Sequence, residues 1–272
     1  MNVGISNIAW PAEEETEVAD ALAELGVDQV EIAPTKVFAD PLDVSQSDLD
    51  DYLAFWGERG IRVVAFQSLL FGRPDLQLFG TPEVRAGFER QLTGFIELGG
   101  RMGARALVFG SPKNRIVPEG LDEERALELA VETFSRLGRI AEENGTCLCI
   151  EPNPPQYGGN WVLDSDAGAA VVAAVDSPGF RLHLDAAGMT MAGDDVGRSI
   201  RDHVGLLQHF HVSAPYLEPI EDEVVDHAAA AAALRETGYA GTVSIEMKSG
   251  EPGTAVDRVR AALTLARGYY AG

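Results

Sequence analysis

Short apolar runs alternate with longer helix-like segments along the whole chain. The apolar runs predict strands at 2–8, 28–33, 62–67, 104–109, 146–151, 180–185, 206–211 and 242–246. The segments between them predict helices at 13–25, 47–60, from 81–83 onward, 122–144, 165–175, 194–203, 223–237 and 254–270. Regular alternation of this kind is typical of parallel βαβ units.

Eight such units predict an α/β fold, a (β/α)8 TIM barrel. We expect one domain over residues 1–272, because that length suits one barrel and no linker or low-complexity tract divides the chain. The main alternative is an open doubly wound sheet, which normally has a glycine-rich phosphate-binding turn after its first strand. Here that turn reads SNIAWPAE, so we favour the barrel.

Four of the predicted strands in the second half end on, or run up to, a residue that can bind a divalent cation. The residues are Glu151, Asp185, His211 and Glu246, at intervals of 34, 26 and 35 residues. The carboxyl ends of parallel strands converge at the mouth of a barrel, so these side chains should meet there. A structural salt-bridge network is the alternative, but four matching positions favour a metal site.

Three carboxylates and one imidazole form a mostly oxygen site. Such a set suits Mn²⁺, which we favour, while Mg²⁺, Co²⁺ and Zn²⁺ are also possible. A cation there can stabilise the enediolate that forms when a carbon beside a carbonyl loses its proton. Glu151 and Glu246 come from the fifth and eighth strands and are the natural acid/base pair.

Several other residues are candidates for contact with a substrate. The loop GSPKNR carries two cations that could hold a phosphate or carboxylate or could be solvated, and Asn153 could bond a hydroxyl or simply form a turn. His183 and His209 precede predicted ligands by two residues and should point into the barrel, as should Lys248, two residues after Glu246. Gln67 and Glu31 end their strands and could line the pocket. The candidate substrate-binding set is Asn153, His183, Lys113, Arg115, Lys248 and Gln67.

Composition narrows the function further. The formal net charge of −22 disfavours nucleic acid, because binding to the phosphate backbone depends on Lys and Arg. We expect no membrane span and no signal peptide, because no apolar run reaches the required length and the start MNVGISNIAW lacks a basic segment. Cys147 and Cys149 share one face of a predicted strand, so we expect packing residues in a reducing cytoplasm.

The motifs IEPNP around Glu151, HLD at Asp185, HFHVS around His211 and SIEM around Glu246 extend the metal-site hypothesis. With them the chain resembles the sugar isomerase and epimerase barrels of the xylose isomerase-like superfamily, which includes ketose 3-epimerases, hydroxypyruvate isomerase, inosose dehydratase and the endonuclease IV type of DNA-repair enzyme. The resemblance covers nearly the whole chain. It implies that these four residues bind the metal, that the two glutamates carry the proton, and that the protein is a homodimer or homotetramer.

The chain also departs from this family at two positions. Ketose epimerases usually have a His three residues after the strand-six Asp, where this chain has Gly188, and an Arg six residues after the strand-seven His, where it has Leu217. Endonuclease IV enzymes bind three metals through many more histidines than the five present here, so DNA repair is disfavoured.

From the predicted metal site and the resemblance together, we expect a metal-dependent isomerase or epimerase of a small sugar or polyol. The alternatives are an inosose dehydratase-like lyase and a non-catalytic metal-binding barrel acting as a partner subunit.

Overall fold

Eight parallel strands close into a barrel in the computed structural model, which describes residues 1–220 and 224–271. Each strand pairs with the next one in the sequence, and β8 pairs with β1. The strands are β1 Val3–Ser6, β2 Gln29–Ile32, β3 Arg62–Phe66, β4 Ala106–Phe109, β5 Leu148–Ile150, β6 Phe180–Asp185, β7 Leu207–Ser213 and β8 Thr242–Glu246. The predicted (β/α)8 barrel is confirmed.

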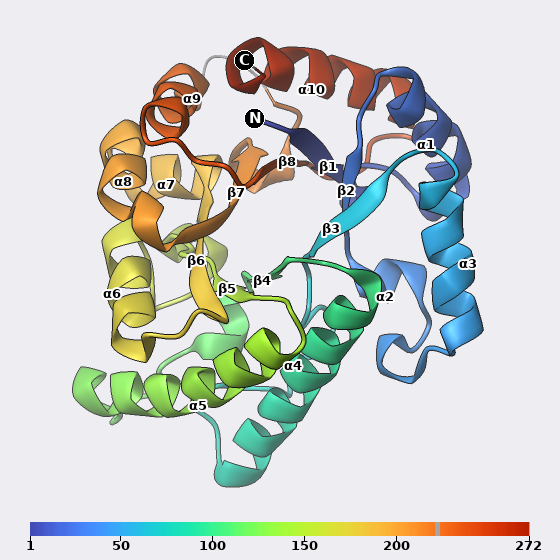
Figure 1. The fold of residues 1–272 in the computed structure, drawn as a ribbon. Helices are drawn as coiled ribbons and strands as arrows, with labels where there is room; N and C mark the ends of the chain where they lie inside the picture. The colour runs from blue at the N-terminus through green and yellow to red at the C-terminus, as the bar shows by residue number, and fades with distance from the viewer. Residues whose placement is uncertain (221–223, 272) are drawn as a thin grey trace.

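Helices form an outer ring around the strands (Figure 1). The α-helices are α1 Glu15–Glu24, α2 Pro34–Val37, α3 Gln46–Gly57, α4 Pro82–Met102, α5 Glu123–Glu143, α6 Ser165–Val175, α7 Ala186–Ala192, α8 Val196–His203, α9 His227–Glu236 and α10 Ala255–Tyr270. Short 3-10 helices are η1 Asn7–Ala9, η2 Ala12–Glu14, η3 Pro41–Asp43, η4 Pro112–Arg115, η5 Pro155–Tyr157, η6 Val204–Leu206 and η7 Pro215–Leu217. Across the described residues, no helix has both the length and the apolar character needed to cross a bilayer.

Two of these helices, α2 and α7, were not predicted. Both are short, and α7 begins at Ala186, directly after the last residue of β6, so no polar loop separates it from that strand. The predicted start of the next-to-last helix at residue 223 lies outside the described residues; α9 itself begins at His227. The other helices lie within a few residues of their predicted bounds.

Local sequence signals explain where the long helices begin. The Thr81 hydroxyl accepts a hydrogen bond from the Val84 N–H, and Pro82 occupies the first turn of α4, where its missing N–H is not needed. Gly103 ends α4 with a φ of 74°, a conformation that costs glycine little. The Asp122 carboxylate caps α5 in the same way by accepting from the Arg125 N–H at 2.8 Å.

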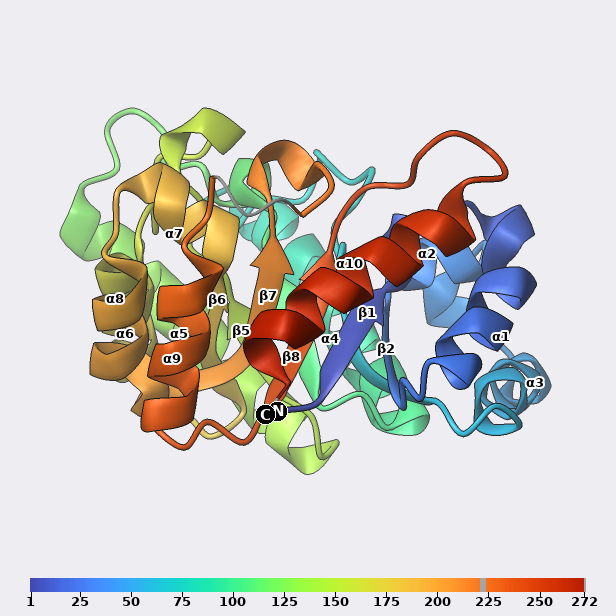
Figure 2. The same ribbon diagram turned by 90° about the horizontal axis from the view of Figure 1, so that it is seen from above.

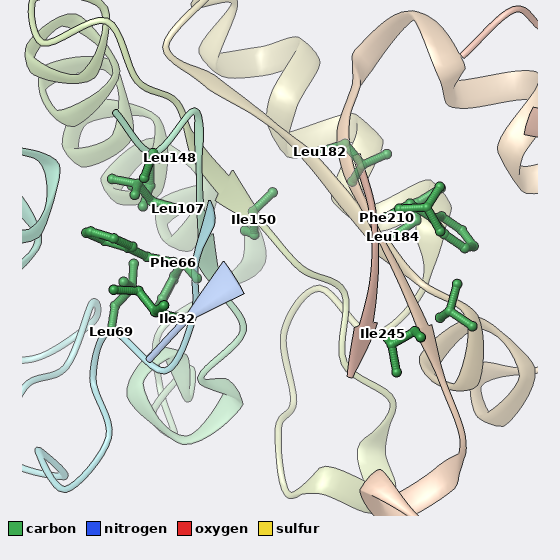
Figure 3. Packing of buried hydrophobic residues seen from close by; sticks show 14 of the residues in the cluster. Ile32, Phe66, Leu69, Leu107, Leu148, Ile150, Leu182, Leu184, Phe210 and Ile245 are labelled. Carbon is green, nitrogen blue, oxygen red and sulfur yellow. The ribbon is translucent and has the colours of Figure 1, made fainter. Parts of the chain in front are cut away.

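Apolar side chains on the outer face of the barrel form the main core with the helices. Figure 3 shows part of this layer on the strands, including Ile150, Leu184 and Phe210. Phe180 of β6 stacks on Phe134 of α5 with ring centroids 4.5 Å apart. This packing holds the strands in register and so positions the residues at their ends.

The interior of the barrel is divided into an apolar and a polar part. On the β3–β5 side it is filled by four small buried residues, Ala65, Ala106, Cys147 and Cys149. Both cysteines are free and buried, which confirms that they are packing residues. The polar part contains buried side chains of β6, β7 and β8 together with Glu31 of β2. Figure 2 shows both chain ends together at one end of the barrel, where the strands begin, so the mouth is the opposite end.

Candidate metal centre at the mouth of the barrel

Three of the four predicted ligands form a compact group at the mouth. One donor atom each of Asp185, His211 and Glu246 lies within 4.8 Å of the other two. Strand pairing produces this group, because Asp185 is the register partner of His211 and Glu246 is the partner of Ser213, two residues further along β7. Residues two apart on a strand share a face, so all three point to the barrel axis.

The carboxylate of Asp185 is fixed through both of its oxygens. Its Oδ1 accepts from the Gly188 N–H at 2.6 Å and thereby caps α7, and its Oδ2 accepts from the Ser213 hydroxyl. Burial and the nearby Glu246 carboxylate raise the pKa of Asp185 to about 6. The site therefore concentrates negative charge that no basic side chain of the group fully offsets.

His211 presents different ring nitrogens to the two sides of the site. Its Nε2 is 3.0 Å from Glu31 Oε2, whereas its Nδ1 faces Glu246 Oε2 at 3.3 Å and makes no hydrogen bond. Burial would lower the pKa of His211, but Glu31 and Glu246 outweigh it and raise that pKa well above its usual value. An unpaired buried nitrogen beside two carboxylates fits a divalent cation, which would be held by His211, Asp185 and Glu246.

Glu151, the fourth predicted ligand, lines the same cavity as Glu246. The cavity has a volume of about 150 Å³ and is lined by Glu151 and Glu246 together with Gln67, Phe71 and Gly110, among others. Burial, Glu246 and Asp185 raise the pKa of Glu151 well above its usual value. The two glutamates predicted to exchange a proton therefore face one space.

Arg115 and Asn153 lie behind Glu151 and support it. Asn153 donates from Nδ2 to Glu151 Oε1 at 3.1 Å, and Arg115 donates from Nη2 to Asn153 Oδ1 at 2.8 Å and to the Glu151 carbonyl at 2.5 Å. Arg115 is fully buried, and this burial lowers its pKa to about 10. The expected solvated or substrate-binding loop cation is therefore corrected: the guanidinium is used within the protein to position Glu151.

Replacing Arg115 with Met should destabilise the fold by about 2–4 kcal/mol, because two carbonyl groups and the Asn153 amide oxygen would lose a buried donor. Urea unfolding at neutral pH measures this. Arg125→Met is the matched control, since Arg125 forms an exposed ion pair with Glu128, and its effect should stay within about 0.5 kcal/mol. Equal losses in the two variants would contradict the supporting role of Arg115.

The other residues predicted to contact a substrate differ in their distance from the mouth and in their exposure. Gln67 is buried, donates to the Ser6 hydroxyl and lines the mouth cavity. His183 points inward as expected but is fully buried behind the mouth. Lys113 is exposed on η4. Lys248 does not follow the expected inward parity: β8 ends at Glu246, and the Lys248 ammonium forms an exposed ion pair with Glu218.

Tyr157 was not predicted and lies near the carboxylates. Its hydroxyl accepts from the Tyr216 N–H at 3.2 Å, and the two rings meet edge to face. Burial raises the pKa of Tyr157 to about 12, and Asp185 and Glu151 add to that effect. Tyr216 and Leu217 both have a φ near 60°, a strained conformation for such residues. The only sequence signal was the position of Tyr157 in the Pro- and Gly-rich loop after Glu151.

Comparison with known proteins places this geometry in a family. The profile of the family described as xylose isomerase-like TIM barrel matches residues 19–267. The chain belongs to this family. The membership confirms the predicted resemblance, and the sugar epimerases among its relatives confirm that the protein is an enzyme.

The individual relatives share only a small part of their sequence with this chain. The L-ribulose 3-epimerase of Mesorhizobium japonicum is 26% identical over 256 residues, which cover 92% of this chain and 82% of that protein. The D-psicose 3-epimerase of Clostridium cellulolyticum H10, solved with D-tagatose, has a TM-score of 0.81 at 19% identity over 99% of both chains. The IOLI protein, solved with a bound zinc atom, has a TM-score of 0.76 at 17% identity over the full length of both. At these identities the solved structures support the fold alone.

Proposed function

We propose that this protein is a divalent-metal-dependent epimerase or isomerase of a small sugar or sugar derivative that acts through an enediolate. The observation that carries the proposal is the convergence of Glu151 and Glu246 on one cavity beside the donors of Asp185 and His211. The relatives named as ribulose and psicose 3-epimerases support the substrate class.

In this proposal the two glutamates exchange roles with the direction of the reaction. Glu246 removes the proton beside the substrate carbonyl, and Glu151, whose raised pKa favours its protonated form, returns a proton to the other face of the same carbon. A bound cation supplies positive charge that stabilises the enediolate oxygens. Asn153 and Arg115 hold Glu151 in place, and Ser213 and the N-terminus of α7 hold Asp185.

The donor set favours Mn²⁺, with Mg²⁺, Co²⁺ and Zn²⁺ as alternatives, because it contains more carboxylate oxygen than imidazole nitrogen. The zinc atom on the IOLI protein shows that a structurally similar barrel can hold that ion. Cytoplasmic location and a homodimeric or homotetrameric state stay predictions.

A dehydratase on the same scaffold is the second candidate. Gly188 offers no side chain at the position where ketose epimerases usually carry a His, and a Cβ there would lie 3.2 Å from Asp185 Oδ1. Leu217 likewise replaces the usual Arg, in a strained turn. Loss of these contacts would suit a substrate other than a simple ketose. A non-catalytic metal-binding barrel is the third possibility and would carry out no proton exchange.

Deuterium incorporation from D₂O tests the proposal. The metal-loaded protein is incubated with ketoses, inososes and sugar phosphates, with added Mn²⁺ or with EDTA, and products are analysed by NMR and mass spectrometry. We expect metal-dependent exchange into a product of unchanged mass apart from the deuterium. A product that has lost water would establish the dehydratase instead. Absence of exchange with every compound in metal-loaded protein would contradict catalysis of this class on these substrates.

The affinity for Mn²⁺ should fall below about pH 6. The metal needs an ionised Asp185, whose pKa is raised to about 6, and an unprotonated nitrogen on His211, whose pKa is also raised. Competition from protons therefore grows as the pH falls, and each displaced proton weakens binding by up to about tenfold per pH unit. The protonation of Glu151, whose pKa is also raised, adds to this effect. Calorimetric titration at about pH 5 and about pH 7.5 measures the difference. Equal affinity at both values would contradict binding through these carboxylates.

A further inference from the structure

Behind the mouth, four buried ionisable side chains form what we call the inner cluster: Glu31, His183, His209 and His211. One ring nitrogen of each histidine lies within 4.8 Å of the other two. The ring of His183 is 4.2 Å from that of His211 and 5.3 Å from that of His209, measured between centroids. The Nε2 atoms of His209 and His211 approach the same Glu31 oxygen at 3.2 and 3.0 Å.

Strand register builds the inner cluster one layer below the mouth group. His183 and His209 are register partners on β6 and β7, just as Asp185 and His211 are partners two residues further on. Glu31 reaches the same level from β2, on the other side of the barrel. The inner cluster therefore joins three strands, and it contains three imidazoles where the mouth group contains one.

His183 is the residue that points to a ligand. Its side chain is fully buried, and neither ring nitrogen has a hydrogen-bond partner. Ser244 of β8 lies opposite His211 in the sheet, and its hydroxyl is also buried and makes no hydrogen bond. Buried polar groups normally have a protein, water or ion partner, so unpaired nitrogens aimed at two further imidazoles call for one.

We propose that the inner cluster is a second divalent-cation site, held by His183, His209 and His211, with Glu31 supplying the compensating negative charge. Imidazole nitrogen is the donor that Zn²⁺ and Co²⁺ accept readily, so this site takes an ion of that class rather than the oxygen-preferring Mn²⁺. The inference goes beyond the proposed function, because this site would bind its ion and link β2, β6 and β7 whether or not the residues at the mouth catalyse a reaction.

The surroundings of the inner cluster include a second cavity and a direct link to the mouth group through His211. His209 lines a cavity of about 400 Å³ at the opposite face of the barrel, with Met1, Gln29 and Arg105 among its other lining residues. In this proposal, that cavity is the side from which an ion would reach the inner cluster. His211 presents Nε2 to the inner cluster and Nδ1 to Glu246. It would bridge the two ions, and filling both sites would leave its ring without a proton.

Metal counting with Co²⁺ as the probe tests the second site. The full chain is stripped with a chelator, dialysed against Co²⁺, and examined for bound cobalt by mass spectrometry and for the absorption bands that report its ligand geometry. We expect two Co²⁺ per chain in the unaltered protein, one in Asp185→Asn, which keeps the inner cluster, and one in His183→Leu, which keeps the mouth group. Zn²⁺ should raise the melting temperature of Asp185→Asn but not that of the double variant Asp185→Asn/His183→Leu.

The opposite results would overturn the proposal. One Co²⁺ in the unaltered protein, or a count and spectrum that His183→Leu leaves unchanged, would show that the inner cluster holds no cation. Should His183→Leu not fold, His209→Gln gives the same test at the neighbouring ligand. A different result would contradict the proposed function: Asp185→Asn would bind as much metal as the unaltered protein, whatever the inner cluster binds.

Discussion

Replacing Glu151 or Glu246 with Gln should lower the rate of epimerisation by about 10²- to 10⁴-fold, the range usual for a residue that transfers a proton. Each variant should nevertheless still exchange deuterium into one of the two epimers. The remaining glutamate can remove and return a proton on its own face of the carbon, whereas the opposite face has lost its acid. NMR with each epimer separately in D₂O, at saturating Mn²⁺, measures both effects.

Metal content must be measured in the same samples, because both glutamates are also predicted ligands. Glu236→Gln is the matched control: Glu236 ends α9 and pairs with Arg201 on the exposed surface, so its loss should leave the rates unchanged. Metal-loaded variants that exchange both epimers at the rate of the unaltered protein would show that neither glutamate is the base. Loss of all exchange in both variants would indicate that one carboxylate cannot act without the other.

The sequence was sufficient to predict which residues lie at the mouth, because the topology of the barrel determines where the strands end. Once eight βα units are recognised, the ends of the strands must converge, and Asp185, His211 and Glu246 do so. Two-residue parity extends this one layer inward, and it places His183 and His209 correctly inside the barrel. The same reasoning fails at Lys248, because strand parity ends where the strand does.

Loop residues and non-local contacts could not be predicted in this way. Nothing in the letters GSPKNR shows that Arg115 turns inward to three buried acceptors while its neighbour Lys113 stays exposed. The contact of Glu31 with His211 joins residues 180 positions apart, so it depends on closure of the barrel rather than on any local pattern. Both arrangements determine the chemistry at the mouth, through the position of Glu151 and the orientation of the His211 ring.

Gly110 is the position where the smallest substitution should have a large effect on activity. It follows β4 at the mouth, and a Cβ built there would lie 1.8 Å from Glu151 Oε2. Gly110→Ala would therefore force the Glu151 carboxylate away from the cavity and from Asn153. Displacing a catalytic group by about 1 Å can cost about 10²-fold in rate, and we expect a loss of at least that order. The D₂O exchange assay measures it.

The melting temperature should change little in Gly110→Ala, because moving a glutamate at the mouth of the barrel disturbs few core contacts. A thermal melting curve therefore shows whether a loss of rate comes from a local change or from unfolding. Gly205→Ala is the matched control, since a Cβ there meets nothing within 4 Å, and it should keep the full rate. If Gly110→Ala exchanged as fast as Gly205→Ala, Glu151 would not need its present position to act. A slow but folded Gly110→Ala variant that still binds Mn²⁺ would instead show that catalysis depends on where Glu151 is held, and that glycine is required there to leave room for it.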